Sequence, residues 1–189
     1  MRKLFKLACL VALAWSASFT VFAAAIQGPC RLIDPSTCAD TKELARTKGF
    51  MQELAHFIGD EKASYFSTDR TVSSQAMSAF NGAPDGVTQL TPSRYLFAAC
   101  PERGCDGSAA AIMLNEYGQI KGLVFSSFHC ATGCEDYRHV DIYMRKDDQD
   151  DAVLAALKAW ATSDKLRKTM SRPDADEGID KRMDVHLLP

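Results

Sequence analysis

Three apolar runs predict the central strands of a sheet. Residues 95–99 form the first run, and residues 108–114 and 119–126 form two more, joined by a short polar turn at 115–118. All three runs are apolar at successive positions, as in strands that are covered on both faces. The last two therefore predict a buried β-hairpin.

Weaker patterns add strands on either side of this hairpin. Residues 139–144 alternate between apolar and polar side chains and predict a half-exposed strand. Strand signals near residues 63–66 are faint, and a turn-rich stretch follows at 81–86. The predicted fold class is α+β: a single domain with an antiparallel sheet of about five strands, flanked by helices and stapled by disulfides.

Two segments predict the helices. Asp40-Thr41-Lys42-Glu43 has the spacing of a capping box and begins a helix that runs to about Ile58, with Gly59 as its end. The acidic run 147–151 precedes a second apolar-faced helix, whose positive N-terminal dipole those carboxylates complement. A carboxylate metal site is the alternative interpretation of this run, and a solvated helix start is favoured over it.

The last part of the chain has no clear pattern. Residues 164–189 are charged and lack a sustained apolar period. Such composition predicts a surface extension or a partly disordered tail. The folded domain is therefore expected to span residues 24–163.

The first residues have the character of an export signal. Arg2, Lys3 and Lys6 precede an apolar run over residues 7–22, and small residues close it near a cleavage site. We interpret residues 1–23 as a signal peptide that is removed. A retained membrane anchor is disfavoured because serine and threonine interrupt a run that barely reaches spanning length. The expected product is soluble, periplasmic and not attached to a membrane.

Removal of this leader changes the charge. The chain has 22 lysines and arginines against 24 acidic residues, and the leader holds three of the basic ones and none of the acidic ones. The mature chain then carries 19 basic and 24 acidic residues, a formal charge of −5. This balance argues against a nucleic-acid partner and mildly favours a basic protein partner.

Six cysteines remain after the leader, in sequence-local couples. An even number of cysteines in an oxidising compartment predicts disulfides, although the sequence does not fix their connectivity. Local pairing would close three small loops, and the Cys100–Cys105 loop would be a rigid polar knuckle beside the sheet. A loop that is stiff before it meets a partner loses less entropy on binding. The couples are Cys30 and Cys38, Cys100 and Cys105, and Cys130 and Cys134.

The sequence shows no catalytic or cofactor motif. A nucleophile elbow, a zinc-protease helix motif and a phosphate-binding glycine loop are all absent. Residues 174–178 only partly fit a calcium loop. His129, Cys130 and Cys134 have too few ligands for a convincing zinc site, and exported cysteines usually oxidise. We therefore expect no catalytic residue, no cofactor and no metal.

Residues 95–127, with the sequence YLFAACPERGCDGSAAAIMLNEYGQIKGLVFSS, resemble the inhibitor-of-vertebrate-lysozyme (Ivy) family. In that family a strand ends in a Cys-x4-Cys loop that is followed by a hairpin of this length. The resemblance implies an exported α+β domain whose disulfide-bridged loop blocks the active-site cleft of a c-type lysozyme. The implied target-binding loop consists of Cys100, Pro101, Glu102, Arg103, Gly104 and Cys105.

The tip of this loop differs from that of the best-known family member. Arg103 occupies the position of a histidine that reaches the catalytic carboxylates there, and Gly104 replaces an aspartate. Because a guanidinium can pair with a carboxylate through two hydrogen bonds, Arg103 is suited to a cleft whose catalytic groups are carboxylates. Glu102 would be repelled by the same carboxylates.

Two function classes follow from the sequence. The first is a non-catalytic inhibitor whose partner is lysozyme or another peptidoglycan-cleaving protein. The alternative is an envelope binding module on the same scaffold, such as an immunity protein. An enzyme of another type would require titratable side chains to converge in a pocket once the chain is folded. The sequence leaves a homodimer open.

Overall fold

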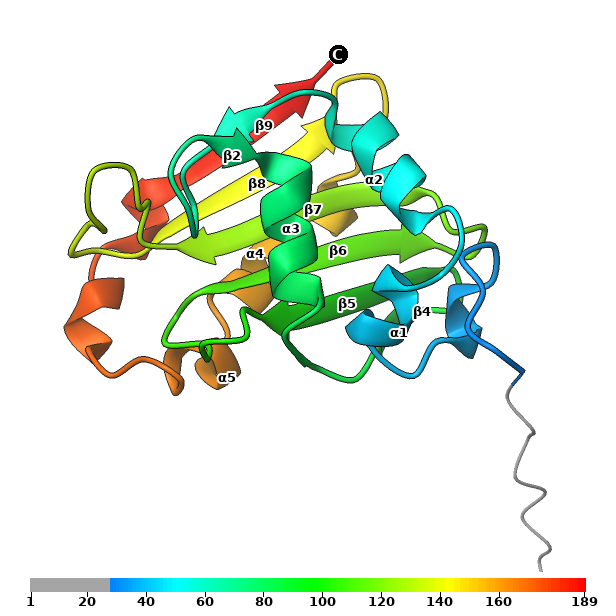
Figure 1. Ribbon diagram of the computed structural model, residues 1–189, viewed down its shortest axis with the longest axis horizontal. Helices are drawn as coiled ribbons and strands as arrows, with labels where there is room; N and C mark the ends of the chain where they lie inside the picture. Colours follow the sequence, from blue (N-terminus) through cyan, green and yellow to red (C-terminus); the bar gives the residue numbers. More distant parts are fainter. Residues whose placement is uncertain (1–27) are drawn as a thin grey trace, which may run out of the picture.

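The computed structural model describes residues 28–189 as three layers, with helices on both faces of a central sheet (Figure 1). The proposed signal peptide, residues 1–23, lies outside the described residues. The α+β fold class is confirmed, and the sheet is larger than predicted, with seven strands instead of about five. These strands are β3 (Ala83–Pro84), β4 (Thr88–Thr91), β5 (Arg94–Cys100), β6 (Ala109–Asn115), β7 (Ile120–Ser127), β8 (His139–Arg145) and β9 (Met183–Leu188).

The strand order is β3-β5-β6-β7-β8-β9, and β4 also pairs with β5. Every pairing is antiparallel except that of β8 with β9. The predicted hairpin is confirmed as β6 and β7, both of which are buried along nearly their whole length. Their two faces pack into separate apolar clusters, as a doubly covered sheet requires.

Three short helices cover one face of the sheet: α1 (Thr41–Ala45), α2 (Phe50–Ile58) and α3 (Val72–Phe80). The prediction of one continuous helix up to Ile58 was wrong, because the helix is interrupted before α2. Helix α1 ends at Ala45 with Arg46 as its C-cap, and Gly49, with φ of 93° in the left-handed region, is the N-cap of α2. The end of α2 at Gly59 is confirmed. The sequence analysis missed α3, whose polar residues and short length weaken its periodicity.

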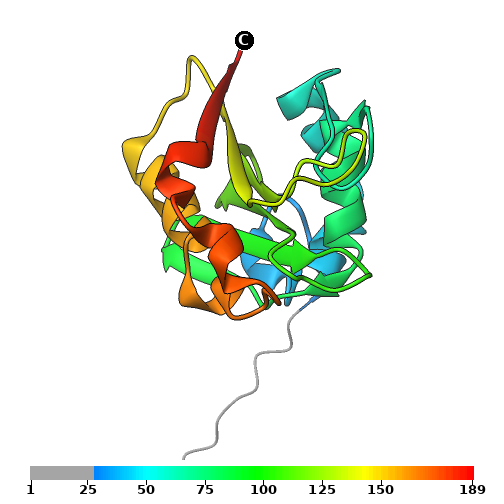
Figure 2. The same ribbon diagram turned by 90° about the vertical axis from the view of Figure 1, so that its left-hand side faces the viewer.

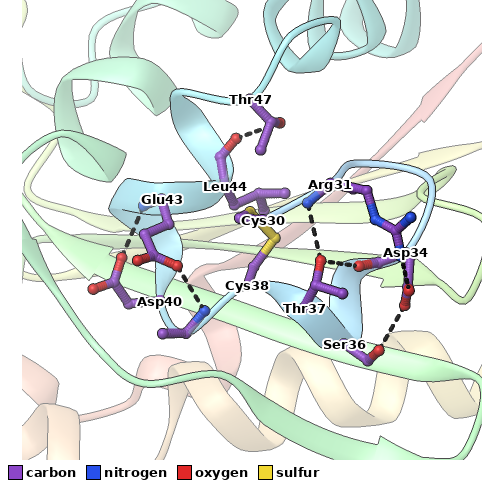
Figure 3. Close-up of a disulfide and its surroundings, with 11 residues drawn as sticks. Cys30, Arg31, Asp34, Ser36, Thr37, Cys38, Asp40, Glu43, Leu44 and Thr47 are labelled. Carbon is purple, nitrogen blue, oxygen red and sulfur yellow. Dashed lines mark hydrogen bonds and ion pairs between the residues drawn. A yellow bond between two sulfur atoms is a disulfide. The ribbon is translucent and has the colours of Figure 1, made fainter. Parts of the chain in front are cut away.

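The N-terminal disulfide joins Cys30 to Cys38 directly before α1 (Figure 3). The Asp40 carboxylate accepts a hydrogen bond from the Glu43 backbone N–H at 2.8 Å, as a capping box predicts. The Glu43 carboxylate in turn accepts from the Ala39 N–H at 3.0 Å. This cap fixes where α1 begins. A short 3-10 turn, η1 (Pro35–Thr37), lies inside the disulfide loop.

Helix α4 (Asp151–Ala161) covers the opposite face, behind the sheet in Figure 1. Its Asp150 cap accepts hydrogen bonds from the first N–H groups of the helix, so the acidic run is a helix start, as predicted. Val153, Leu157 and Ala161 are fully buried against the sheet. A separate two-stranded ribbon, β1 (Lys62–Ala63) with β2 (Arg70–Thr71), lies on the face of the first three helices.

The segment 164–189 is part of the fold, in contrast to the surface extension or disordered tail expected from its sequence. It contains α5 (Asp164–Arg167), the 3-10 turns η2 (Pro173–Asp176) and η3 (Ile179–Arg182), and the edge strand β9. Its few apolar side chains, which are too widely spaced to show a period, are buried. They are Leu166, Met170, Ala175, Ile179 and Leu188.

A buried ion pair anchors this segment. The Arg138 side chain has no exposed surface, and its guanidinium donates to Asp176 Oδ1 from Nε at 2.8 Å and again from Nη2. It also donates to Ser126 Oγ at 2.8 Å and to the Ala161 carbonyl at 2.9 Å. Burial lowers the pKa of Arg138. The hydrogen bond to the Asp176 carboxylate opposes that shift. Buried polar contacts among four residues thus replace the apolar pattern that sequence analysis looks for.

Strand β8 was predicted as half exposed, and this was wrong. Residues 140–144 are buried, because β9 covers the edge and both faces have partners. Val140, Ile142 and Met144 face α4, whereas Asp141 and Tyr143 face the other side. That polar face of β8 contributes to the candidate site described below.

Two features bear on where the protein is found. Among residues 28–189, no helix has the length and apolar character needed to cross a membrane. All three sequence-local cysteine couples form disulfides. Disulfides persist in oxidising compartments, so the protein is placed outside the cytoplasm.

Candidate functional site

The predicted loop, residues 100–105, lies at one end of the sheet, between β5 and β6. Glu102, Arg103 and Gly104 are exposed, and the two cysteines are half-buried at the base. Figure 2 faces this end of the molecule, where the green loop after β5 and the yellow-green loop after β7 come to the surface. The exposure that a target-binding loop requires is therefore present.

The tip of this loop is a tight turn closed by the disulfide. The Cys100–Cys105 bridge brings the two Cα atoms within 4.8 Å. The Gly104 N–H donates to the Pro101 carbonyl at 3.0 Å, and Gly104 has φ of 101°. Because other residues rarely adopt that angle, glycine allows a turn this short.

The base of the loop is held by the C-terminal segment. Asp106 Oδ1 accepts hydrogen bonds from Ser171, from its N–H at 2.7 Å and its hydroxyl at 2.9 Å. The Gly107 N–H donates to Thr169 Oγ1 at 3.0 Å, and the Gly107 carbonyl accepts from Ser126. The backbone hydrogen bond from Ser171 is the main cause that lowers the pKa of Asp106. The loop is thus braced below its tip.

The charged side chains at the tip have no partner among the residues that the structure describes. Within residues 28–189, Arg103 takes part in no side-chain hydrogen bond or ion pair, and neither does Glu102. A guanidinium that is held out on a stiff turn keeps all its donors for another molecule.

A second stapled loop lies beside the first. Cys130 and Cys134 close a turn within the segment between β7 and β8, and the Glu135 N–H donates to the Phe128 carbonyl at 2.7 Å. The two loops border an open groove of about 430 Å³. Its charged lining residues come from both loops and the C-terminal segment: Arg103, Asp106, Glu135, Asp136 and Arg172.

A pocket of about 360 Å³ opens on the polar face of β8 and β9, beneath the β1–β2 ribbon. At its floor Asp141 is 4% exposed and accepts two imidazole hydrogen bonds. His129 Nε2 lies 2.7 Å from Oδ2, and His186 Nε2 lies 2.8 Å from Oδ1. Three elements that are distant in sequence therefore meet on one carboxylate.

This arrangement shifts all three pKa values. Burial alone would raise the pKa of Asp141, but the hydrogen bonds from His129 and His186 outweigh it and hold the pKa below its usual value. The hydrogen bond to Asp141 raises the pKa of each imidazole, while partial burial opposes that shift. Each imidazole thus donates a hydrogen bond to the carboxylate and helps to keep it ionised.

Two buried tyrosines complete the wall of the pocket. Their hydroxyls, on Tyr65 and Tyr143, are hydrogen bonded to each other at 2.5 Å. Burial raises the pKa of both phenols, that of Tyr143 to about 12. Tyr65 stacks on Phe125 and Tyr143 stacks on His186. These phenols stay protonated at neutral pH and act as hydrogen-bonding walls.

Two more polar groups lie at the rim. His139 Nε2 is 2.8 Å from Glu135 Oε2, and the rings of His129 and His139 stack with their centroids 4.2 Å apart. Ser127 of β7 pairs in register with His139 of β8. Its buried hydroxyl has no hydrogen-bond partner in the described part of the chain. The zinc set considered from sequence does not form, because Cys130 and Cys134 are bonded to each other.

The sequence analysis missed this pocket. It considered His129 only beside Cys130 and Cys134, and it placed His186 in a segment outside the folded domain. The usable signal was the alternation within β8, which puts His139, Asp141 and Tyr143 on one face of a strand. The parallel register of β9, which brings His186 beside Tyr143, has no local sequence signal.

The sequence analysis made convergence of titratable groups the criterion for an enzyme, and here such groups do converge. However, the hydrogen bonds of His186 and of His129 Nε2 both end on Asp141, so neither bond activates a nucleophile. The molecule thus offers two distinct candidate features, an exposed charged loop and a polar pocket.

No protein-family model, no curated protein and no solved structure matches this chain.

Proposed function

We propose that this protein is a periplasmic proteinaceous inhibitor of c-type lysozyme and acts without chemistry of its own. The observation that carries the proposal is the loop 100–105: it is stapled, braced at its base and exposed, with Arg103 unpaired among the described residues. Its sequence context resembles that of the loop with which Ivy proteins block the lysozyme cleft.

The stiffness of the loop favours binding. Ordering a mobile loop on association costs about 0.5–1.5 kcal/mol for each immobilised flexible side chain. In this loop the disulfide, the Gly104 turn and the Asp106–Ser171 hydrogen bonds fix the backbone beforehand. Only the side chains of Glu102 and Arg103 remain to be ordered.

The charges at the tip define the expected contact. Arg103 would donate two hydrogen bonds to a catalytic carboxylate of lysozyme. Glu102 beside it would be repelled by the same carboxylates, so it must point toward the rim of the cleft. The formal charge of −5 after removal of the leader would speed the encounter with a basic enzyme at low salt.

A second candidate function is an envelope binding module for another peptidoglycan-cleaving protein or a delivered toxin. The observation that favours it is the groove between the two stapled loops, which makes the binding face wider than one protruding tip. In that case binding would depend on Asp136 or Arg172 at least as much as on Arg103.

The test is lysis of a bacterial cell-wall suspension by a c-type lysozyme, in the presence of increasing amounts of the oxidised mature protein. We expect dose-dependent inhibition that weakens at least about 30-fold in Arg103→Ala, the effect of losing a central contact worth about 2 kcal/mol. Glu102→Gln is expected to inhibit as well as the parent or better, because it removes a repulsive charge.

Arg70→Ala is the matched control, since Arg70 is also an exposed arginine but lies on the β1–β2 ribbon. It should leave inhibition unchanged. Absence of inhibition at large molar excess would refute the lysozyme proposal. Inhibition that is insensitive to Arg103→Ala but lost in Asp136→Ala or Arg172→Ala would favour the wider face over the loop tip.

A further inference from the structure

Three metal-binding side chains converge at the rim of the pocket, on the second stapled loop and the start of β8. His129, Glu135 and His139 each offer one ligand atom, and these atoms all lie within 4.8 Å of one another. We propose that they form a binding site for a divalent transition-metal ion, with Zn²⁺ as the best-matched ion. This site is separate from the tip of loop 100–105 and does not depend on the proposed inhibitory function.

The distances among the three groups fit such a site after small side-chain movements. In a tetrahedral zinc site with bonds of about 2.0–2.1 Å, neighbouring ligand atoms are roughly 3.3 Å apart. Here Glu135 Oε2 is 2.8 Å from His139 Nε2, and Glu135 Oε1 is 4.0 Å from His129 Nδ1. These distances run to the two different oxygens of the carboxylate and lie on either side of the required separation, so a rotation of the Glu135 side chain is needed to close the site. Glu135 is half-exposed and can adjust, since it is not packed in the core.

Asp141 prepares His129 for this role. Its carboxylate accepts a hydrogen bond from His129 Nε2 at 2.7 Å, so the neutral imidazole has its proton on Nε2. The lone pair is then on Nδ1, the nitrogen that faces Glu135. A carboxylate that orients a ligating histidine through its other nitrogen is a recurrent support of zinc sites. His186 holds the second oxygen of Asp141 and keeps that carboxylate in place.

The backbone of the Cys130–Cys134 loop also brings Glu135 toward His129. His129 has φ of 43°, a left-handed conformation that non-glycine residues seldom adopt. The Cys130–Cys134 disulfide and the hydrogen bond from the Glu135 N–H to the Phe128 carbonyl then return the chain, so that Glu135 faces His129. The third disulfide therefore gives the ligands their spacing.

The chemistry of the ligands selects the class of ion. Two imidazoles and one carboxylate suit zinc and its neighbours among the transition metals, whereas calcium and magnesium prefer oxygen-only sites. Three protein ligands leave at least one coordination position open. His129 and Glu135 also line the pocket with Tyr65, Tyr143 and His186, so an open position would face that pocket.

The proposal is tested by titrating the oxidised mature protein, prepared without a histidine tag and freed of metal, with Zn²⁺ in a calorimeter. We expect one ion to bind per chain. Glu135→Gln and His139→Ala should each weaken binding by roughly 100-fold or more, and Asp141→Asn by about 10–100-fold. Because the Glu135 side chain lies outside the core, Glu135→Gln tests the site without the risk of unfolding the domain.

His56→Gln is the matched control, since it removes the histidine on α2 and should leave zinc affinity unchanged. Co²⁺ titration gives an independent readout, because a tetrahedral site produces strong visible absorption that Glu135→Gln should abolish. The proposal is overturned if 100 μM Zn²⁺, on the order of a hundred times a micromolar Kd, gives no saturable binding. It is also overturned if Glu135→Gln and His139→Ala bind like the parent.

Discussion

The two stapled loops at the end of the sheet are nearly the same size, yet their charged residues point in opposite directions. The Cys100–Cys105 loop presents Arg103 to solvent on a turn that ends with Gly104. The Cys130–Cys134 loop turns Glu135 back onto two histidines. A short disulfide spacing thus predicts stiffness, but the position of the charged residue, within the bridge for Arg103 and just after it for Glu135, decides whether the loop reaches outward or encloses a site.

The largest effect is expected at the support that the two loops share. Asp176→Asn would leave Arg138 buried without its carboxylate, and loss of one partner of a buried ion pair costs about 3–5 kcal/mol. Urea denaturation would measure this loss in the free energy of unfolding. Asp174→Asn, an exposed change in the same turn, is the control and should be nearly neutral. Equal stability of the two variants would show that the ion pair does not anchor the segment.

Removal of each disulfide should weaken one of the two proposed functions and leave the other unchanged. By chain entropy each bridge stabilises the fold by about 2 kcal/mol, because the closed loops have similar lengths. Cys100→Ser with Cys105→Ser should weaken lysozyme inhibition about 10-fold and leave zinc affinity unchanged. Cys130→Ser with Cys134→Ser should weaken zinc binding about 10-fold and leave inhibition unchanged. If both double variants affect both activities equally, the loops work as one unit.

The smallest effect is the dependence of stability on pH around Asp141. The raised pKa values of His129 and His186 stabilise the fold fully below about pH 6.5, the value in the unfolded chain, and this contribution is lost as pH rises through their folded pKa values. The lowered pKa of Asp141 contributes above about pH 3.9 and is lost as pH falls through its folded value.

Stability should therefore decline above pH 6.5 by an amount on the order of 1 kcal/mol, because solvent screens the half-exposed imidazoles. Chemical denaturation over pH 5 to about 9 in a metal chelator measures this decline. Asp141→Asn should flatten the curve, whereas His56→Gln should retain it. A parent curve that rises across this range would contradict the assigned hydrogen bonds.

The sequence predicted the structure best where buried elements are formed by residues that lie close together in the chain. The β6–β7 hairpin, α4 and the local disulfides were all predictable, because runs of apolar residues, an acidic cap and short cysteine spacings are local signals. The prediction of a break-free first helix failed between Ala45 and Phe50, where the chain leaves the helix at Arg46 and begins α2 after the left-handed Gly49.

The candidate pocket could not be predicted in the same way. It depends on β9, whose register places His186 beside Tyr143, and on a loop that returns Glu135 to His129. The first contact joins β8 to a charged final segment that resembles a solvated tail, and the second depends on the backbone path of the disulfide-closed loop. The buried Arg138 explains the error, since a paired charge inside the protein looks in the sequence like a charge at the surface.

The C-terminal segment with the parallel strand β9 also links the two stapled loops. Among residues 28–189, β9 is the last strand along the chain and closes this edge of the sheet. Until it docks, Asp141 lacks His186, and until the segment before it docks, Asp106 lacks Ser171. Both stapled loops therefore depend on the same C-terminal segment, so a copy trimmed before Thr169 would lack supporting contacts at each of them.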